Sequence, residues 1–558
     1  MSQPNPSTAQ ARAIADELAR HGVLRAMISP GSRSAALAIA LEESPIAVDV
    51  VVDERSAAFR ALGISRATGA PVAGVSTSGT AGANFFPAVV EADLSSVPLI
   101  ILTADRPPEL RDVGSNQTID QVGMFGAKVR WFCDLGIATS DFDGNGYWRS
   151  AVSQAVARAM GHGRSPGPVH LNVSFREPTV PVTDDGRVQG AAYRYPIDGR
   201  EGGTPWQESL VAARRGAVLP DSEGRRGLLV VGEDWGDDAA GLMEEARRLG
   251  WPVLATALSG LRGEEVVTTY HHLLVDGVPL GLAPDLVVAA GRIGPSDRLA
   301  ALTALDVPRI QVDRWGRWHD PRRHSTALVG GDLVATLGLI GQGCGEEWST
   351  LWMARDARMR EALRDSVDAD GILTGPAVAS AASSMPWQAL TAASSMPVRD
   401  IDAHTVGPGR VFANRGASGI DGFTSTAIGV ASCFDRTMAV SGDLSFLHDL
   451  SGLLGFGDVN LVLVIVDNNG GGLFDLLPPA EHSPSFERLF VAPHGRDLTA
   501  IGASLGFEAT RVGSLDHLEE SAWRGLEEGG AHVVIAPVER GAELKQRAGL
   551  DEVARLVS

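Results

Sequence analysis

The chain has 558 residues, of which 44% are hydrophobic and 21% charged. This composition is ordinary for a globular protein of several domains. Its formal net charge of −20 and pI of about 5.1 argue against a nucleic-acid-binding surface, because such surfaces work mainly by neutralising phosphates. An anionic ligand must therefore meet a local cluster of arginines.

The three cysteines, Cys133, Cys344 and Cys433, lie far apart and have neither metal-ligand nor disulfide-framework spacing, which favours a reducing compartment. The amino terminus lacks a basic region followed by an apolar one, so we expect no signal peptide. The longest apolar runs, such as residues 461–466, have the length of a strand and are too short to span a bilayer. We expect a soluble, cytoplasmic protein.

Strand and helix patterns alternate from Ser7 to about Pro178, which predicts a doubly wound parallel sheet. A helix is expected up to Arg20, with Ser7 or Thr8 as its cap. The predicted strands cover residues 24–28, 47–52, 71–75, 98–103 and 168–173.

Polar loops follow several of these strands. The segments 31–33 and 78–80 each lie between a strand and a helix, where backbone donors and the helix dipole favour an anion. Residues 103–106 end another strand, and Asn116 and Gln117 lie in the polar loop after it. Converging at one edge of the sheet, these loops would form a polar pocket, although each alone could be an ordinary cap.

The loop at residues 52–56 contains Asp53 and Glu54. Asp53 is a credible helix cap, and Glu54 is a favourable acid in the first turn. A purely structural interpretation of this pair therefore stays open beside a functional one.

Residues 179–206 are polar, with several glycines and prolines, and predict a linker. We place domain boundaries at 1–180, 207–345 and 346–558, with a linker at 181–206. Strands at 228–231, 252–255, 286–289 and 309–312 predict a smaller α/β domain in the middle. Its glycine turns lack the Gly-x-Gly-x-x-Gly pattern, so a dinucleotide site is not expected. Arg292, Arg298 or neither reaches an anionic substrate from this domain.

The last domain begins with a helix predicted at 348–365. The hexapeptide Ala-Ala-Ser-Ser-Met-Pro occurs twice, at 381–386 and 392–397. We favour the second copy as a functional loop at a strand end, because it runs directly into the segment Pro397-Val-Arg-Asp, which contains Arg399. A glycine-rich loop at 412–422 precedes a helix predicted at 425–432, and such loops let backbone approach a ligand closely.

Two short apolar runs, at residues 438–441 and 461–466, predict buried parallel strands. Asp443 follows the first run, and Asn468 follows the second. Because the carboxyl ends of parallel strands meet at one edge of a sheet, these side chains should lie close together. Mg²⁺ prefers such oxygen ligands, so we expect a site formed by Asp443, Asn468 and the carbonyl of Gly470. A one-residue shift would replace Asn468 with Asn469.

The Gly-Asp and Asn-Asn segments resemble the thiamine-diphosphate motif, with Leu444 in place of its usual last glycine. Together with segments 29–33, 53–56, 77–80, 104–107, 116–117, 414–422 and 442–445, they resemble the SEPHCHC synthases (2-succinyl-5-enolpyruvyl-6-hydroxy-3-cyclohexene-1-carboxylate synthases, MenD) of menaquinone biosynthesis. The likeness spans the whole chain, and Leu444 is the usual residue in that family.

This resemblance implies three doubly wound parallel-sheet domains, which bind the pyrimidine, form a central transhydrogenase-like scaffold and bind the diphosphate. It also implies a transferase that decarboxylates 2-oxoglutarate on thiamine diphosphate and adds the succinic-semialdehyde carbanion to isochorismate. This 1,4-addition gives SEPHCHC and carbon dioxide. The implied metal is Mg²⁺ or Mn²⁺, and the implied assembly is a homodimer or homotetramer with active sites between subunits. Neither nucleic acid nor membrane is an implied partner.

The resemblance also assigns roles to residues. Glu54 would activate the cofactor through a pyrimidine ring nitrogen. The other expected catalytic or substrate-binding residues are Ser32, Arg33, Arg106, Asn116, Gln117, Arg399 and Arg415. Besides Glu54 and the metal ligands Asp443, Asn468 and Gly470, the expected cofactor-binding residues are Ser78, Ser395, Gly419, Ile420, Leu444, Ser445, Leu473 and Phe474.

Three alternatives remain. Another thiamine-diphosphate 2-oxo acid decarboxylase or an acetolactate-synthase-like carboligase would share Glu54 and the metal site but not the set of arginines. A nucleotide-dependent oxidoreductase is disfavoured by the missing glycine fingerprint. A catalytically silent binding subunit is disfavoured by the intact Glu54, Asp443 and Asn468.

Overall fold

The structure is a computed structural model that describes residues 5–139, 144–180, 199–209, 216–219, 222–294, 296–367, 371–407, 409–455 and 457–557. Most of the predicted linker lies outside these residues. The chain divides into two compact units. The first comprises Met1–Val211, Asn414–Cys433 and Ser445–Val459, and the second comprises Ala212–Ala413, Phe434–Leu444 and Asn460–Ser558. No helix in the described ranges is both long and apolar enough to cross a membrane.

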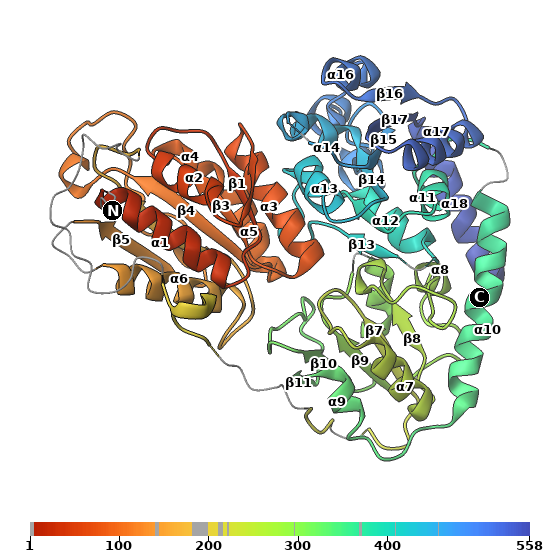
Figure 1. Cartoon of the computed structure of the whole chain (residues 1–558). Helices are drawn as coiled ribbons and strands as arrows, with labels where there is room; N and C mark the ends of the chain where they lie inside the picture. Colours follow the sequence, from red (N-terminus) through yellow and green to blue (C-terminus); the bar gives the residue numbers. More distant parts are fainter. Residues whose placement is uncertain are drawn as a thin grey trace. The chain divides into compact units, whose positions relative to one another are not determined.

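The first unit contains a six-stranded sheet in the order β2-β1-β3-β4-β6-β5 (Figure 1). All its strand pairs are parallel. The strands are β1 Arg25–Ile28, β2 Ala47–Val50, β3 Val72–Ser76, β4 Leu99–Asp105, β5 Phe132–Ile137 and β6 Val169–Ser174.

Helices cover both faces of this sheet. The helices are α1 Pro6–Arg20, α2 Ala35–Glu42, α3 Glu54–Thr68, α4 Thr80–Asn84, α5 Phe86–Ser95, α6 Asn145–Ala159 and α13 Phe423–Ala431. Side chains of α1, α2 and α6 pack on one face, and those of α3 and α5 pack on the other. Alternate residues of a strand point to opposite faces, so a strand covered on both sides is apolar throughout. β4 is buried along its whole length.

Two details of this unit differ from the sequence-based expectation. Asn5 caps α1, because its side chain accepts the N–H of Thr8 and Pro6 occupies the first turn, where a missing N–H has no cost. Neither Ser7 nor Thr8 is the cap. The edge strand β5 was not predicted, because it is only half-buried and contains Asp134 and Gly136.

The second unit contains two further parallel sheets. The five-stranded sheet has the order β11-β10-β9-β7-β8, with β7 Gly227–Val231, β8 Val253–Ala255, β9 Leu286–Ala290, β10 Arg309–Asp313 and β11 Ala327–Gly330. Helices α7 Ala239–Leu249 and α9 Leu333–Leu337 pack on one face. Helices α8 Tyr270–Leu273 and α10 Glu346–Val367 pack on the other. Strand β11 was not predicted, because it is short and mostly half-exposed.

The six-stranded sheet of the second unit has the order β13-β12-β14-β15-β17-β16. Its strands are β12 Ala389–Ala392, β13 Arg410–Phe412, β14 Thr437–Gly442, β15 Leu461–Asp467, β16 Glu508–Arg511 and β17 Ala531–Pro537. Its helices are α11 Gly375–Ser383, α12 Met396–His404, α15 Pro479–His482, α16 Leu498–Ser504, α17 Leu515–Glu528 and α18 Arg540–Val557. Helix α14, Asp443–His448, follows β14 directly.

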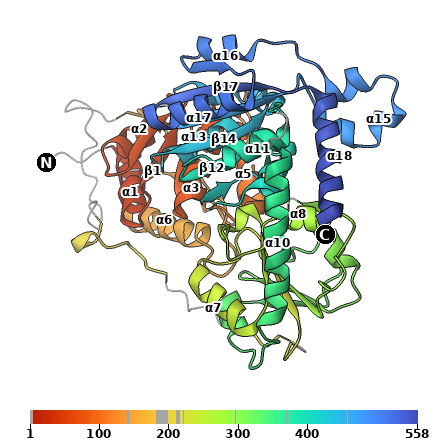
Figure 2. The same ribbon diagram turned by 90° about the vertical axis from the view of Figure 1, so that its right-hand side faces the viewer.

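One continuous apolar core joins the two sheets of the second unit. The long helix α10 contributes Trp348, Trp352 and Met359 near the five-stranded sheet and Leu363 and Val367 toward the six-stranded one. Figure 2 shows α10 running alongside α18. The expectation of three doubly wound parallel sheets is confirmed.

Short 3₁₀ and π elements complete the described structure. They are 3₁₀ turns at Pro108–Leu110, Gly126–Lys128, Glu201–Gly203, Ala257–Ser259, Asp297–Ala304, Leu450–Leu453 and Gly472–Leu476, and a π turn at Glu487–Val491.

Candidate active site

Asp443 lies where the two central strands of the six-stranded sheet end. Strands β14 and β15 are parallel neighbours, with Gly442 opposite Val466. Asp443 follows β14, and its Oδ2 accepts the backbone N–H of Gly470, from the loop after β15, at 2.7 Å. Its Oδ1 accepts the N–H of Leu444 at 2.6 Å. The structure thus brings the Gly-Asp and Asn-Asn segments together.

The two adjacent asparagines of the second segment differ in what their amide oxygens do. Oδ1 of Asn468 is buried and has no hydrogen-bond partner. Oδ1 of Asn469 accepts the N–H of Gly495 at 2.8 Å. An unpartnered buried acceptor is costly unless a ligand satisfies it. Asn468, rather than Asn469, therefore has an oxygen to offer a cation.

Two further side chains that are able to bind a cation, those of His494 and Asp467, lie near this point, and the sequence reasoning missed both. His494 Nε2 lies 3.3 Å from Asp443 Oδ2 and 3.7 Å from Asp467 Oδ1. One ligand atom of each of these three side chains lies within 4.8 Å of the others. Burial raises the pKa of Asp443, against the opposing effect of its hydrogen bonds with Gly470 and Leu444. The donor set of carboxylate and amide oxygens fits a divalent cation.

Gly470 is required by its conformation and its surroundings. Its φ is +138°, and a Cβ at this position would lie 2.2 Å from the carbonyl oxygen of Val491. Just beyond it, Leu473 and Phe474 lie half-buried in the turn Gly472–Leu476. The ring of Phe474 lies 5.6 Å from that of Phe490.

The duplicated hexapeptide has a different structural position in each copy. The first copy ends α11, whereas the second follows β12 and leads into α12. In the second copy, Ser395 has φ +79° and ψ −132°, a region that residues other than glycine rarely adopt and that is typical of functional loops. Arg399, one turn later, donates from Nη1 to the carbonyl of Ser395 at 2.6 Å.

The glycine-rich loop before α13 belongs to the first unit. Arg415 is half-buried, Gly419 is half-buried, and Ile420 is 38% exposed. Ser445 donates from Oγ to the carbonyl of Ile420 at 3.1 Å, so this hydroxyl holds the loop at Ile420.

The first sheet carries two buried arginines at the carboxyl ends of β1 and β4. Arg33 donates from Nη1 to the carbonyl of Phe175 at 3.0 Å and forms a 3.0 Å ion pair with Glu177. Burial, and then the charge of Arg33, lowers the pKa of Arg106. Arg33 Nε and Arg106 Nη1 are buried without a hydrogen-bond partner. Two neighbouring cations with unsatisfied donors fit a carboxylate.

The neighbouring loops are joined through Ser78. Gln117 donates from Nε2 to the carbonyl of Ser78 at 3.0 Å. The N–H of Gly79 donates to Oε1 of the buried Gln121 at 2.9 Å. Ser32 and Asn116 are exposed. The sequence reasoning missed Gln121, because one glutamine in a polar loop gives no sign that it will be buried.

Behind Arg106 lies a buried polar network that the sequence reasoning also missed. Asp105 accepts the N–H of Arg106 at 2.7 Å, Asn172 Nδ2 at 2.9 Å and Arg111 at 2.7 Å. Burial raises the pKa of Asp105. Asn172 Oδ1 in turn accepts Thr103 Oγ1 at 2.8 Å. These bonds fix the backbone from which Arg106 extends.

Glu54 lies in the first turn of α3, where Asp53 caps the helix by accepting the N–H groups of Arg55 and Ser56. The capping role of Asp53 therefore coexists with the role expected for Glu54. In the single chain the Glu54 side chain is half-buried. Glu54 belongs to the first unit, and Asp443 belongs to the second.

The topological switch point of the middle sheet lies between β7 and β9. An antiparallel bridge joins Glu233 to Arg292 there, and a Cβ on Gly232 would lie 2.0 Å from the carbonyl oxygen of Arg292. The side chains of Glu233 and Arg292 also form a 2.6 Å ion pair. Arg298 binds both carboxylate oxygens of Asp551, at 2.6 and 2.7 Å. Both candidate arginines of this domain thus have acidic partners within the chain.

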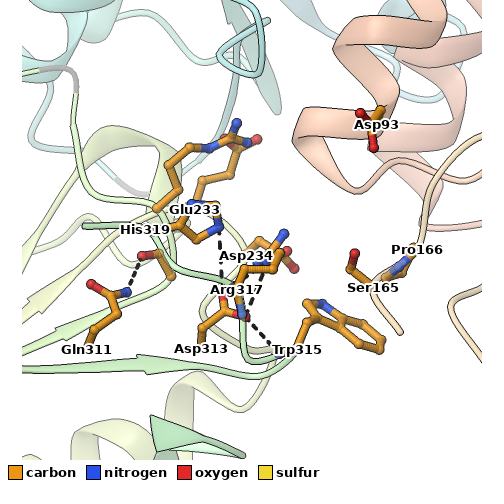
Figure 3. Close-up of polar contacts among 12 residues, drawn as sticks. Asp93, Ser165, Pro166, Glu233, Asp234, Gln311, Asp313, Trp315, Arg317 and His319 are labelled. Atoms are coloured by element: carbon orange, nitrogen blue, oxygen red, sulfur yellow. Dashed lines mark hydrogen bonds and ion pairs between the residues drawn. The ribbon is translucent and has the colours of Figure 1, made fainter. Parts of the chain in front are cut away.

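Figure 3 shows the charged loop at the end of β10. Asp313 accepts the backbone N–H of Trp315 and of Arg317, each at 2.9 Å. Burial raises the pKa of Asp313, but the Arg317 guanidinium outweighs this effect and holds it below the ordinary value. Burial, together with Arg317, lowers the pKa of His319 to about 4. The ion pairs that Arg317 forms with Asp313 and Asp234 favour a structural role for this loop.

Sequence comparison identifies the relatives of this chain. Residues 9–124 match the family model "Thiamine pyrophosphate enzyme, N-terminal TPP binding domain". The 2-succinyl-5-enolpyruvyl-6-hydroxy-3-cyclohexene-1-carboxylate synthase of Thermobifida fusca is 40% identical, over 98% of this chain and 99% of the relative. The enzyme of the same name from Geobacillus kaustophilus is 38% identical, over 98% of each chain. The chain belongs to the SEPHCHC synthase family.

Membership in the SEPHCHC synthase family agrees with the fold. The crystal structure of benzoylformate decarboxylase from Polynucleobacter necessarius has a TM-score of 0.67 and 19% identity, over 95% of this chain and 98% of that one. At this identity the likeness shows the fold alone. The resemblance expected from the sequence is confirmed, and this SEPHCHC synthase family member is a thiamine-diphosphate enzyme.

Proposed function

We propose that this protein catalyses the SEPHCHC synthase reaction. The enzyme removes carbon dioxide from 2-oxoglutarate and adds the remaining four-carbon unit to isochorismate by 1,4-addition. Family membership supports this assignment. The structural observation that carries it is the pair Arg33 and Arg106, in which one nitrogen of each guanidinium, Arg33 Nε and Arg106 Nη1, is buried without a hydrogen-bond partner. Both proposed substrates are dicarboxylates, and arginine forks match carboxylate geometry.

The cofactor site is proposed at the ends of β14 and β15. Asp443, Asn468 and the carbonyl of Gly470 would hold Mg²⁺ or Mn²⁺ together with the diphosphate, and the unpartnered Asn468 oxygen supports this. When bound, thiamine diphosphate supplies an electron sink for the negative charge left by loss of carbon dioxide. The residues proposed to line the cofactor are Ser78, Ser395, Gly419, Ile420, Leu444, Ser445, Leu473 and Phe474.

Glu54 is proposed as the acid that hydrogen-bonds a pyrimidine ring nitrogen and shares its proton. A general acid–base group must lie within hydrogen-bond reach of the proton that it transfers. Glu54 lies in the first turn of α3, and Asp53 caps that helix. The cap fixes the backbone from which the Glu54 side chain extends. Its half-buried side chain in the single chain is consistent with a site that a second subunit completes.

The substrate site is proposed to combine four arginines, Arg33, Arg106, Arg399 and Arg415, with Ser32, Asn116 and Gln117. The arginines would bind carboxylates, and the exposed Ser32 and Asn116 would orient isochorismate with Gln117. Gln117 is itself placed by its bond to Ser78. Because Arg292 and Arg298 are paired with Glu233 and Asp551, neither is included.

We further propose a cytoplasmic homo-oligomer, either a dimer or a tetramer, with the active site between subunits. Glu54 of one subunit would then serve the metal site of another. The three domains are proposed at 1–180, 207–345 and 346–558, since each range contains one of the three sheets.

The test is product formation by the purified protein with thiamine diphosphate, Mg²⁺ and 2-oxoglutarate, with and without isochorismate. We expect carbon dioxide and an adduct of the mass of SEPHCHC only when both substrates and the cofactor are present. Carbon dioxide without adduct would instead indicate another thiamine-diphosphate decarboxylase or carboligase. Neither product, with no cofactor binding by calorimetry, would overturn the proposal.

A further inference from the structure

Glu91 is a buried acid that the proposed function does not use. It lies on α5 and is 2% exposed. Its partners are Arg66 on the neighbouring helix α3, whose Nη2 lies 3.1 Å away, and Ser95, one turn later on α5 itself, whose Oγ donates at 2.6 Å. These two groups alone do not use all the acceptor positions of a carboxylate.

The remaining contacts of Glu91 are with the loop that carries Arg415. The N–H of Gly416 donates to Oε1 at 2.8 Å, and the N–H of Ala417 donates to Oε2 at 2.6 Å. Each carboxylate oxygen thus holds one of two consecutive peptide groups. The nitrogen of Gly416 belongs to the peptide bond that directly follows Arg415, so this bidentate contact fixes the backbone from which the Arg415 side chain extends.

The loop also approaches α5 too closely for most other residues. A Cβ on Gly416 would lie 2.7 Å from Ser95 Oγ, 2.8 Å from the carbonyl oxygen of Glu91 and 2.9 Å from Leu94 Cβ. Glycine at 416 therefore permits the contact that Glu91 holds. Hydrogen bonds from backbone N–H to a carboxylate are stronger than neutral ones, and burial removes competing water.

The two ends of this loop have separate anchors. Glu91 holds residues 416 and 417, whereas Ser445 holds the carbonyl of Ile420. The first anchor is next to a proposed substrate-binding residue, and the second is next to a proposed cofactor-binding residue.

We propose that Glu91 is a positioning residue that sets the location of Arg415 for binding a substrate carboxylate. This inference rests on the proposed function. It makes Glu91 responsible for substrate affinity and leaves cofactor affinity to the Ser445 end of the loop.

The test compares three variants. Glu91→Gln keeps the volume of the side chain but has one acceptor oxygen, so its amide nitrogen faces a backbone donor. We expect the KM of one of the two substrates to rise about tenfold, with kcat and the Kd of thiamine diphosphate changed less than about threefold. Ser445→Ala should show the reverse, with a weaker Kd for thiamine diphosphate. Glu43→Gln, an exposed acid paired with Arg12, is the matched control for loss of charge.

Another variant of the same contact, Gly416→Ala, and a readout other than kinetics cover the case in which Glu91→Gln does not fold. Gly416→Ala keeps the charge of Glu91 but pushes the loop from α5, and should raise the same KM. Hydrogen exchange at the amides of residues 416 and 417 should accelerate in either variant, with the rest of the protein unchanged. The inference would be overturned if hydrogen exchange at residues 416 and 417 and the substrate KM both stayed unchanged. It would also be overturned if kcat, substrate affinity and cofactor affinity all fell by the same factor.

Failure of the proposed function can be distinguished from failure of this inference. If wild-type protein forms no adduct, the proposed function is wrong, and the role in substrate binding falls with it. Hydrogen exchange at residues 416 and 417 and cofactor calorimetry still decide the anchoring itself, because neither depends on turnover.

Discussion

Gly470 donates its backbone N–H to Oδ2 of Asp443 at 2.7 Å. This bond joins two residues that lie 27 positions apart in the sequence, and it ties the carboxylate to the loop that contains Asn468, whose amide oxygen is buried without a partner. The register of two neighbouring strands, with Gly442 opposite Val466, brings the loops together.

Replacing Asp443 with alanine should remove metal-dependent cofactor binding. The change deletes the buried carboxylate and leaves the N–H of Gly470 without its acceptor. We expect calorimetric affinity for thiamine diphosphate in Mg²⁺ to fall about 100-fold. The exposed Asp516→Ala is the control, and unchanged affinity in Asp443→Ala would exclude the proposed metal site.

Substitutions of the two adjacent asparagines, Asn468 and Asn469, should have different effects on calorimetric affinity for thiamine diphosphate. Asn468→Ala removes an acceptor with no other partner, so cofactor affinity should fall by more than about tenfold. In Asn469→Gly the new glycine tolerates the φ of +59° that Asn469 adopts. This variant should therefore change cofactor affinity by less than about threefold. The opposite order would move the metal ligand to Asn469.

Glu54→Gln should abolish turnover while the protein folds and binds cofactor. An amide cannot share a proton as a carboxyl does, and general acid–base groups contribute about 10²–10⁴-fold to rate. Adduct formation should fall within that range at an unchanged thermal midpoint. Asp53→Ala is the contrasting variant, since it removes the helix cap and should lower stability by about 1 kcal/mol. Normal turnover in Glu54→Gln would remove the proposed mechanism.

Arg106→Lys should weaken substrate binding although the charge is kept. The lysine ammonium lacks the planar fork that binds both carboxylate oxygens, and charge-assisted hydrogen bonds contribute about 1.5–3 kcal/mol. We expect kcat/KM to fall by about 10- to 100-fold, measured by adduct formation. Arg12→Lys, at an exposed ion pair, is the control. If kcat/KM is retained in Arg106→Lys, the carboxylate lies elsewhere.

His170 should make the protein sensitive to acid. It is fully buried, and burial lowers its pKa from 6.5 to about 3. Below pH 6.5 the unfolded chain binds a proton at this histidine and the folded chain does not. The contribution of neutral His170 to the free energy of unfolding is therefore fully present above pH 6.5 and is lost as the pH falls toward 3. Between pH 7.5 and 5.5 the wild type should lose about 1.4 kcal/mol through this group.

The comparison for that prediction is His170→Gln. Glutamine does not titrate, so the variant should lose about 1.4 kcal/mol less over the same pH interval, whatever its stability at pH 7.5. Urea unfolding at the two pH values measures the difference. Equal losses in the two proteins would show that His170 is not the titrating group.

Much of the fold followed from the amino-acid pattern. The central strands β14 and β15 are short apolar runs, and they begin and end within a residue of their predicted positions. The other four strands of that sheet, β12, β13, β16 and β17, were not predicted. The edge strands β5 and β11 escaped prediction, because a strand covered on one side needs few apolar residues. The helix cap at Asn5 escaped it because two other residues that can cap a helix, Ser7 and Thr8, follow closely.

The sequence by itself determined the family, the three parallel sheets and which loops stand at strand ends, because these depend on local patterns and on rules of parallel-sheet topology. Only the tertiary structure decided that Asn468 rather than Asn469 has a free oxygen, that Arg292 and Arg298 are paired, and that Glu91 holds the Arg415 loop. These outcomes depend on which groups far apart in the sequence come within about 3 Å. Hydrogen bonds and ion pairs act at that distance, and the spacing of residues along the chain does not encode it.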